Sequence, residues 1–222
     1  MKAKNSNISR INRTSQISKE EQAYLQIKKN IIARKFAPGQ KIIFRDLEEI
    51  LGMSKTPITS ALARLEQEGF LSSEHNRGYY VKELSKDEIK QLYRLRIGLE
   101  EIAVEFAVDN YKSDEFAKLN SILDAYLKHD CSFYDAKRLQ LDLDFHLQIA
   151  RMGGNKYLIQ FLTQIYERAR IGLNPVFMTP LIPRFRDEHS QIVEAIKRRD
   201  AQQAKMLIRA HEHISIELLD SN

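Results

Sequence analysis

Apolar positions recur every three or four residues through the first third of the chain, which predicts amphipathic helices. A first helix begins at Ser18, which forms a capping-box pattern with Glu21, and it continues through EEQAYLQIKKNIIARKF. Two shorter helices follow at residues 45–52 and 55–68, and FLSSEHNRGYYVKE predicts two strands around a turn at 75–78. Helix, turn, helix and hairpin in this order predict a winged helix-turn-helix.

Beyond Ser85 the pattern is helical throughout, and a second capping box, Ser85 with Glu88, marks the start of a new domain. The expected fold is mainly α: an N-terminal winged helix-turn-helix with a small β-hairpin wing, then a C-terminal all-α six-helix bundle. The expected bundle helices are 86–110, 113–129, 132–152, 155–171, 184–199 and 201–220. The expected domains are a disordered basic arm at 1–18, a winged helix-turn-helix at 19–84 and a helical effector-binding and dimerisation domain at 85–222.

The segment QLDLDFHLQIARMGG, residues 140–154, fits two patterns at once. Within it, apolar and polar residues alternate strictly over LDLDFHLQI, which is typical of a strand. However, residues 134–152 contain neither glycine nor proline, and they are rich in leucine, glutamine, alanine, lysine and arginine, which favour helices. We therefore interpret the segment as a helix.

The charge is unevenly distributed along the chain. Residues 1–84 contain 15 Lys and Arg against 9 Asp and Glu, whereas residues 85–222 contain 20 against 21. A basic N-terminal module joined to a near-neutral domain indicates binding to a polyanion such as double-stranded DNA. The basic arm lacks the apolar core of a signal peptide; a transit peptide is compositionally possible, but a disordered arm fits better.

Other features of composition point to the cytoplasm. The single cysteine, Cys131, excludes an internal disulfide framework and suits a reducing compartment. No apolar run approaches the roughly 18 to 20 residues that span a bilayer, so no membrane partner is expected.

The helix at 55–68 has the arrangement of a recognition helix. Its apolar residues share the face that packs on the first two helices, so the polar residues of its N-terminal end point outward toward a major groove. Lysine there can contact guanine or phosphate, and threonine can contact phosphate or a thymine methyl. The expected DNA-binding residues are Arg45, Ser54, Lys55, Thr56, Thr59, Arg77 and Gly78. The alternatives are that these residues are merely solvated, or that the module binds another protein.

The segment FAPGQKIIFRDLEEILGMSKTPITSALARLEQEGFLSSEHNRGYYV resembles the winged helix-turn-helix of the GntR family of bacterial transcription regulators. The resemblance covers about 45 residues, and it includes the Pro38-Gly39 turn, Thr56-Pro57, Glu68-Gly69 and Arg77-Gly78. The family usually has arginine at the positions of Lys55 and Thr59. Without these two guanidinium groups, bidentate readout of guanine is less expected.

Three histidines and one aspartate fall on the apolar faces of three different bundle helices. Asp142 and His146 lie one helical turn apart, which places their Cβ atoms about 5–6 Å from each other. His189 and His211 lie on the inward stripes of the last two helices, whereas His213 faces outward. The four residues are a candidate site for Zn, Ni, Fe or Mn, with Zn favoured. The alternative is that each histidine is a hydrogen-bonded core residue and that Asp142 pairs with a cation.

The six helices are similar to FCD, the all-helical effector domain found in GntR regulators. The motifs DLDFH, EHSQIVEAIKRRD and AQQAKMLIRAH match the metal-binding pattern of that domain at Asp142, His146, His189 and His211. The resemblance implies a metal that orients a small organic acid effector. It also implies that Arg96, in RIGLE, binds the effector carboxylate; a salt bridge to Glu100 is the alternative.

The sequence thus predicts a ligand-responsive regulator that is a homodimer, because one recognition helix reads too few base pairs. Three alternatives remain. The bundle could bind a bulky apolar, acyl-type effector without metal, or the metal could be purely structural. A metal-dependent hydrolase with an attached DNA reader is the third, but HExxH is absent and no general base lies beside the expected ligands, so no enzyme is expected.

Overall fold

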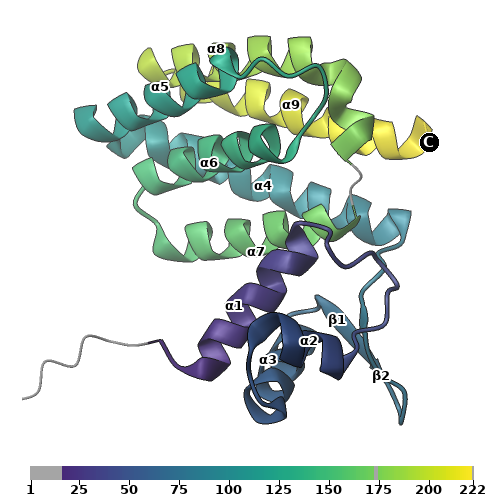
Figure 1. Ribbon diagram of the computed structural model, residues 1–222. Helices are drawn as coiled ribbons and strands as arrows, with labels where there is room; N and C mark the ends of the chain where they lie inside the picture. Colours follow the sequence, from purple (N-terminus) through teal and green to yellow (C-terminus); the bar gives the residue numbers. More distant parts are fainter. Residues whose placement is uncertain (1–16, 173–174, 222) are drawn as a thin grey trace, which may run out of the picture.

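The computed structural model describes residues 17–172 and 175–221. Figure 1 shows two parts: a small domain that includes a hairpin, and a larger helical domain above it. The residues expected to form the basic arm lie outside the described part of the chain, except Ile17 and Ser18. No helix in the described ranges is both long and apolar enough to cross a membrane.

The small domain is a winged helix-turn-helix. Its elements are α1 (Lys19–Ile32), α2 (Phe44–Leu51), α3 (Lys55–Gln67), β1 (Leu71–Glu74) and β2 (Gly78–Val81). The strands are antiparallel, with Leu71 opposite Val81. Gly52 ends α2 in the left-handed region at φ 61°, a conformation that glycine adopts without strain and that turns the chain into α3.

The larger domain is all-helical in its described residues. Its elements are α4 (Lys86–Asn110), α5 (Ser113–Lys128), α6 (Ala136–Met152), α7 (Lys156–Gly172), the 3₁₀ helix η1 (Pro175–Leu181), α8 (Ile182–Lys197) and α9 (Ala201–Ser221). The capping box at Ser85 and Glu88 forms as expected. Residues 140–152 of the segment with two patterns are helical, so that prediction is confirmed.

Three details differ from the sequence-based expectation. At Ser18 only half of the capping box forms, because Glu21 pairs with Arg64 of α3 instead. Helix α6 begins at Ala136 rather than 132, since the Asp135 side chain caps its first turn. The proline-containing break before α8 includes a 3₁₀ helix, and α8 begins at Ile182, two residues early, because proline is accommodated in a first turn.

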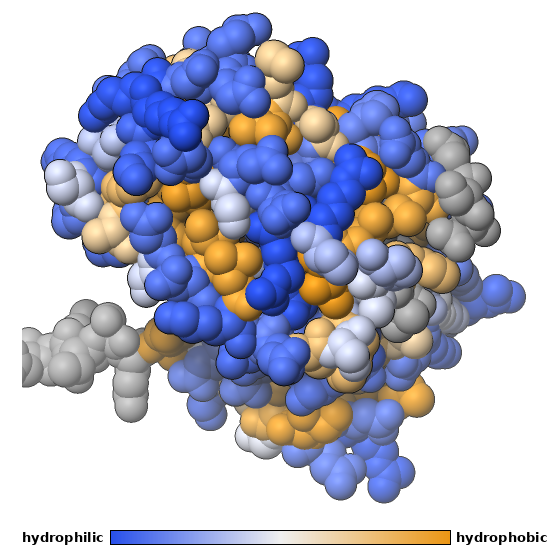
Figure 2. All heavy atoms as spheres, turned by 90° about the horizontal axis from the view of Figure 1, so that it is seen from above, coloured by the Kyte–Doolittle hydropathy of each residue, from blue (hydrophilic) through white to orange (hydrophobic). Residues whose placement is uncertain are grey.

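The two domains have separate apolar cores that meet at α7. The small domain's core lies between α1, α2, α3 and the hairpin, yet it includes Ile171 from α7. Figure 1 shows α7 running between the larger domain and α1. The Lys28 ammonium of α1 lies 2.8 Å from the Glu167 carboxylate of α7, and Arg168 donates to the Glu68 carbonyl oxygen at the end of α3. Seen from above, the larger domain has a mostly polar surface with separate apolar patches (Figure 2).

Candidate metal centre and DNA-binding surface

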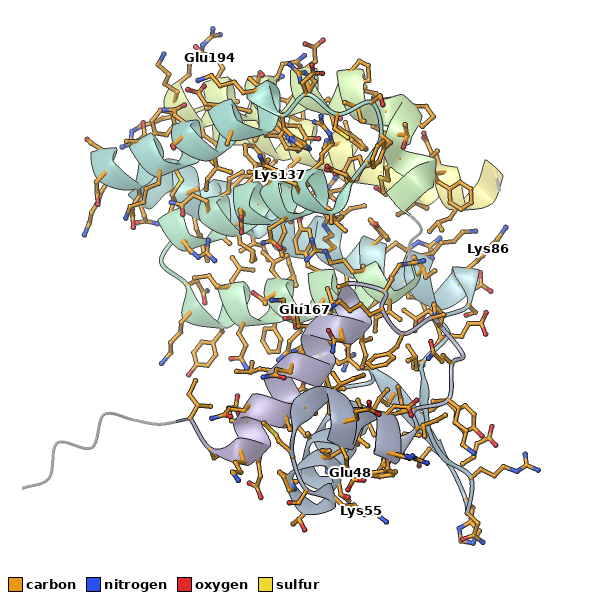
Figure 3. All side chains as sticks on the ribbon, in the orientation of Figure 1. Glu48, Lys55, Lys86, Lys137, Glu167 and Glu194 are labelled. Atoms are coloured by element: carbon orange, nitrogen blue, oxygen red, sulfur yellow. The ribbon has the colours of Figure 1, made fainter. Side chains whose placement is uncertain are left out.

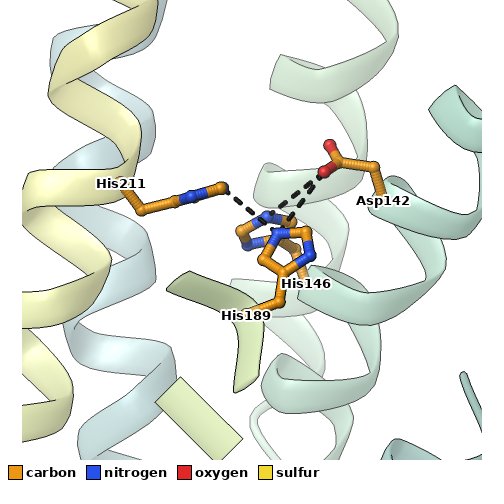
Figure 4. A group of neighbouring side chains, drawn as sticks. All are labelled: Asp142, His146, His189 and His211. Atoms are coloured by element: carbon orange, nitrogen blue, oxygen red, sulfur yellow. Dashed lines mark hydrogen bonds and ion pairs between the residues drawn. The ribbon is translucent and has the colours of Figure 1, made fainter. Parts of the chain in front are cut away.

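Four side chains from three helices converge inside the larger domain. Asp142 and His146 come from α6, His189 from α8 and His211 from α9, and Figure 4 shows them pointing toward one another. The histidines are buried, and the Asp142 side chain is 13% exposed. The inward positions predicted from helical periodicity therefore place the four residues together.

The distances between their ligand atoms fit a single metal ion. His189 Nε2 lies 3.3 Å from His211 Nε2 and 3.5 Å from Asp142 Oδ1, and His146 Nε2 lies 4.0 Å from the same oxygen. All four ligand atoms lie within 4.8 Å of one another. Atoms bound to one zinc ion are separated by about 3.0–3.4 Å when each bond is about 2.0–2.1 Å. A small inward movement would bring the set to bonding distance.

Two of the histidines are oriented by carboxylates behind them. His146 Nδ1 lies 2.6 Å from Glu100 Oε2, and His211 Nδ1 lies 2.8 Å from Glu188 Oε2. Both contacts leave Nε2 directed at the centre, and His146 Nε2 is buried without a hydrogen-bond partner in the described part of the chain. A carboxylate behind a ligating imidazole fixes its tautomer and raises its basicity, an arrangement typical of metal sites.

The charge state of the imidazoles follows from burial and from these carboxylates. Burial, together with His211 and His146 nearby, holds the pKa of His189 well below its ordinary value. Burial also lowers the pKa of His211, although Glu188 partly offsets it. Burial acts in the same direction on His146, but the Glu100 carboxylate outweighs it and raises the pKa of that imidazole. His189 and His211 are thus neutral near pH 7, as metal ligands must be.

A second cluster, formed by Glu100, His146 and Glu212, overlaps the first one. Its two carboxylates are already occupied by Arg96, which lies 2.8 Å from Glu100 Oε1 and 2.5 Å from Glu212 Oε1. Burial raises the pKa of Glu212 to about 8 despite the neighbouring Arg96. The cluster of Asp142 and the three histidines is therefore the better candidate metal site. The second cluster contributes Glu100, which contacts Nδ1 of His146.

Arg96 lies in the position that helical periodicity predicted, pointing into the domain. Besides its two carboxylate partners, its guanidinium contacts the Tyr166 hydroxyl and lies 3.8 Å from the centre of that ring. The predicted alternative, a salt bridge to Glu100, is present, and Arg96 also lines the cavity next to the candidate metal ligands. Its predicted role as an effector ligand stays a prediction.

A small cavity of about 30 Å³ opens beside the four candidate metal ligands. Asp142 and His211 form one wall, and the others carry Arg96, Arg170, Ser215 and three tyrosines: Tyr93, Tyr134 and Tyr166. A volume of this size has room for one or two water molecules. The lining combines these hydrogen-bonding groups with apolar side chains such as Leu139, Met178 and Phe185.

The expected DNA-binding residues lie on the small domain. Ser54, Lys55, Thr56 and Thr59 are exposed at the N-terminal end of α3, and Figure 3 shows Lys55 at the end of the molecule remote from the larger domain. The Ser54 side chain makes no capping hydrogen bond, although Ser54 occupies the N-cap position of α3. Thr59 Oγ1 donates to the Lys55 carbonyl oxygen.

The remaining predicted DNA contacts flank that helix. Arg45 is exposed in the first turn of α2, and Gly78 lies half-buried at the start of β2. The Arg77 side chain is 75% exposed on the hairpin and pairs loosely with Glu74. These cations and hydroxyls lie on one domain, as a DNA-binding face requires; their individual roles stay predictions.

Sequence reasoning missed several residues around the site. Glu188 and Glu212 are direct neighbours of His189 and His211, so each lies about 100° around the helix from its histidine and off the apolar stripe. Arg170 and the tyrosines are common residues without a motif of their own. A glutamate next to His189 and another next to His211 were the signal available.

Two family models match the chain. The model for bacterial regulatory proteins of the gntR family matches residues 19–81, and the FCD domain model matches residues 91–213. The second match alone covers more than half of the chain. The chain belongs to the GntR family and carries an FCD domain. This GntR protein is therefore a transcription regulator of the ligand-responsive type.

Relatives and solved structures agree with that assignment. The regulator YdhC of Bacillus subtilis is 28% identical over 196 residues, which is 86% of each chain. The Nta operon transcriptional regulator of Aminobacter aminovorans is 34% identical over 137 residues, covering 61% of this chain and 64% of that protein. Escherichia coli McbR/YncC has the same fold, with a TM-score of 0.78 at 23% identity over 93% of this chain and 99% of that one.

Proposed function

We propose that this GntR regulator is a cytoplasmic homodimer that binds an operator through α3 and the hairpin, and that a metal-assisted pocket in its FCD domain binds a small organic acid. The observation that supports the pocket is the convergence of three imidazole Nε2 atoms and one carboxylate oxygen beside a small cavity. Effector binding would shift the populations of operator-binding arrangements and so change the affinity for DNA.

The residues that would hold the metal are Asp142, His146, His189 and His211, with Zn favoured among Zn, Ni, Fe and Mn. The metal would act as a Lewis acid toward an effector oxygen. The protein's own contribution is to keep the imidazoles oriented through Glu100 and Glu188. The cavity's small size favours a small acid over a bulky acyl-type effector.

A homodimer follows from the way short recognition helices read DNA, because two half-sites one helical turn apart provide the necessary specificity. The large domain presents exposed apolar side chains on two neighbouring helices: Leu95 and Ile102 on α4, and Met206 on α9. Their exposed fractions are 55%, 41% and 58%, so a second copy could bury them. Light scattering on the purified protein at several concentrations measures the mass of the assembly, and a monomer at all of them contradicts the proposal.

The metal is tested by plasma mass spectrometry on untagged protein. Wild type should carry about one transition metal ion per chain, and His146→Ala should lose it, because each structural ligand contributes to affinity. His213→Ala is the matched control: it removes an exposed histidine from α9, two residues from His211, and should keep the metal. Metal-free wild type, or retention by His146→Ala, contradicts the site.

Retention of the fold after chelation would exclude a purely structural metal. Lack of turnover of a model ester or phosphoester by the metal-loaded protein would exclude the hydrolase.

The DNA contact is tested by measuring operator affinity against salt concentration. Lys55→Ala should weaken binding and reduce the slope of log affinity against log salt by about one if Lys55 meets a phosphate. Lys128→Ala is the control of equal charge change, because Lys128 is 81% exposed on α5 of the larger domain. Equal behaviour of the two variants contradicts a role for Lys55.

A further inference from the structure

Three side chains that differ in chemistry meet where the chain passes from α5 to α6. His129 is the residue that follows the last turn of α5, Cys131 lies in the connection, and Asp135 caps the first turn of α6. One possible ligand atom from each of the three lies within 4.8 Å of the other two. We call this group the connection cluster, and it shares no residue with the candidate metal centre.

The imidazole and the thiol both act on the Asp135 carboxylate. His129 Nε2 lies 2.9 Å from Asp135 Oδ1 and 3.0 Å from Asp135 Oδ2. Burial raises the pKa of Asp135, but hydrogen bonds from the Arg138 backbone, His129 and Cys131 outweigh it and lower the pKa below its ordinary value. The carboxylate is therefore charged near neutral pH, and a nitrogen and a sulfur lie next to it.

Imidazole, thiolate and carboxylate are the three groups with which proteins bind zinc. In tetrahedral coordination their ligand atoms are separated by about 3.3–3.6 Å, because the Zn–S bond is about 2.3 Å and the Zn–N and Zn–O bonds are about 2.0–2.2 Å. The distances in the connection cluster lie on both sides of that range, so small rotations of the side chains are enough to reach it. A thiolate and an imidazole select zinc or cobalt over magnesium and calcium.

The connection cluster is open to solvent, unlike the candidate metal centre. The side chains of His129 and Asp135 are 13% and 23% exposed, and Cys131 is half-buried. A cation can therefore enter without any movement of the helices, and the fourth coordination position is left to water. Three ligands and access to solvent give weaker binding than four largely buried ligands, so this site fills when metal is added and empties during purification.

We propose that His129, Cys131 and Asp135 bind a second divalent transition metal ion of the zinc class, through one imidazole nitrogen, one thiolate sulfur and one carboxylate oxygen. The thiol gives up its proton to the solvent when the ion binds. The proposal does not rest on the proposed function, because neither the effector pocket nor its ligands take part.

An ion at this place would join the end of α5 to the start of α6. Asp135 Oδ1 accepts from the Arg138 backbone N–H at 2.7 Å, and Arg138 Nη2 donates to the His129 carbonyl oxygen at 2.6 Å. Arg138 lies one helical turn before Asp142 on α6. The ion would thus fix the first turn of the helix that carries two residues of the candidate metal centre, and it would slow amide hydrogen exchange there.

Cobalt(II) is the probe that tests the proposal, because a cobalt–thiolate bond absorbs in the near ultraviolet by charge transfer, whereas cobalt bound only by nitrogen and oxygen does not. Cys131 is the only cysteine of the chain, so this absorption reports on the connection cluster alone. Wild type titrated with cobalt in a thiol-free reductant should develop the absorption, with about one thiolate-bound cobalt per chain at saturation. Cys131→Ser should not develop it.

Two further variants test the other ligands. His129→Ala should weaken cobalt binding at this site by at least about tenfold, since even residues behind a metal ligand typically contribute 10- to 100-fold. Asp135→Asn keeps an acceptor for the helix cap, so it should melt like wild type and still bind cobalt more weakly. His75→Ala is the control: it removes an exposed histidine from the hairpin turn and should keep the absorption.

The outcomes separate this inference from the proposed function. In excess zinc, wild type should hold about two ions per chain and Cys131→Ser about one. No charge-transfer absorption in wild type, or unchanged cobalt affinity in His129→Ala, overturns the inference and leaves the candidate metal centre untouched; a purely structural contact between His129 and Asp135 predicts that result. About one zinc ion in wild type and none in Cys131→Ser would contradict the proposed metal centre and support the connection cluster.

Discussion

The histidines of the candidate metal centre each have two ring nitrogens, and in His146 and His211 the two nitrogens have different contacts. Nε2 of His146 and of His211 faces the centre, while Nδ1 of each contacts a glutamate on a different helix. The glutamates therefore determine which nitrogen is available as a ligand. Helical periodicity predicts which residues point inward, but the choice of nitrogen depends on contacts between α4 and α6 and between α8 and α9.

Glu188→Ala tests this orientation of His211. Removing the carboxylate that accepts from Nδ1 should weaken zinc binding by about 10- to 100-fold, as is typical for residues behind a metal ligand. Zinc affinity is measured by competition with a chelator of known affinity. Glu194→Ala serves as control, because Glu194 lies on the same helix and pairs with the exposed cations Lys197 and Arg198. Equal affinities of the two variants would show that Glu188 does not orient the ligand.

The sequence predicted the inward histidines but not the charge network around them. Asp142 and His146 were predictable because two residues four apart share a helix face whatever the neighbouring helices do. Glu212 could not be predicted in the same way. It lies off the apolar stripe of α9, and only the close packing of α4 on α9 buries it against Arg96. Likewise Arg170 lies at the edge of its helix, and its environment depends on both domains.

At the scale of elements, local sequence signals predicted whether a segment is a helix or a strand better than they predicted its first and last residues. The helix at 136–152 forms despite its alternating pattern, because both of its faces are covered in the domain core: Leu143, Phe145, Leu147 and Ile149 are all buried. A helix buried on both sides can carry apolar residues at every second position. Its first turn is determined by the Asp135 cap, which the pattern of apolar residues does not show.

The contact between α1 and α3 makes the DNA-binding domain sensitive to acid. Glu68 accepts hydrogen bonds from Tyr24, Lys28 and Arg64. Burial raises the pKa of Glu68, but these three partners outweigh it and lower the pKa below its ordinary value. The unfolded chain therefore binds a proton at Glu68 at higher pH than the folded chain does. Stability is fully present above the unfolded pKa and is lost as pH falls through the folded pKa.

We expect the free energy of unfolding of wild type to decrease as pH falls from about 4.5, the ordinary glutamate value, toward 3. Glu68→Gln should make that decrease shallower, because the titrating group is gone. Urea unfolding at several pH values, followed by circular dichroism, measures the slope. Glu74→Gln on the hairpin is the control and should leave the slope unchanged. The same slope in Glu68→Gln and wild type would mean that other carboxylates cause the acid sensitivity.

At the scale of the whole molecule, α7 belongs to both domains. Tyr166 and Arg170 face the cavity, Leu162 is buried in the core of the larger domain, and Ile171 is buried in the core of the DNA-binding domain. A change in the cavity that moves α7 must therefore also change its contacts with α1 and with the end of α3. Such a shared rigid element is a physical basis for coupling between two sites.

Ile171→Ala should uncouple the two domains while leaving the metal centre intact. Truncating a buried isoleucine to alanine lowers the free energy of unfolding by about 2–5 kcal/mol. Here the substitution removes packing between α7 and the small domain. In wild type, zinc should slow amide hydrogen exchange in α1 and α3 as well as in the larger domain, whereas in Ile171→Ala the slowing should stop at α7. Leu162→Ala removes a similar side chain from the same helix but from the other core, so it should lower stability and still transmit the effect of zinc to α1. Zinc could instead slow exchange in α1 equally in Ile171→Ala and in wild type. That result would contradict transmission through this contact and would point to the chain connection between β2 and α4.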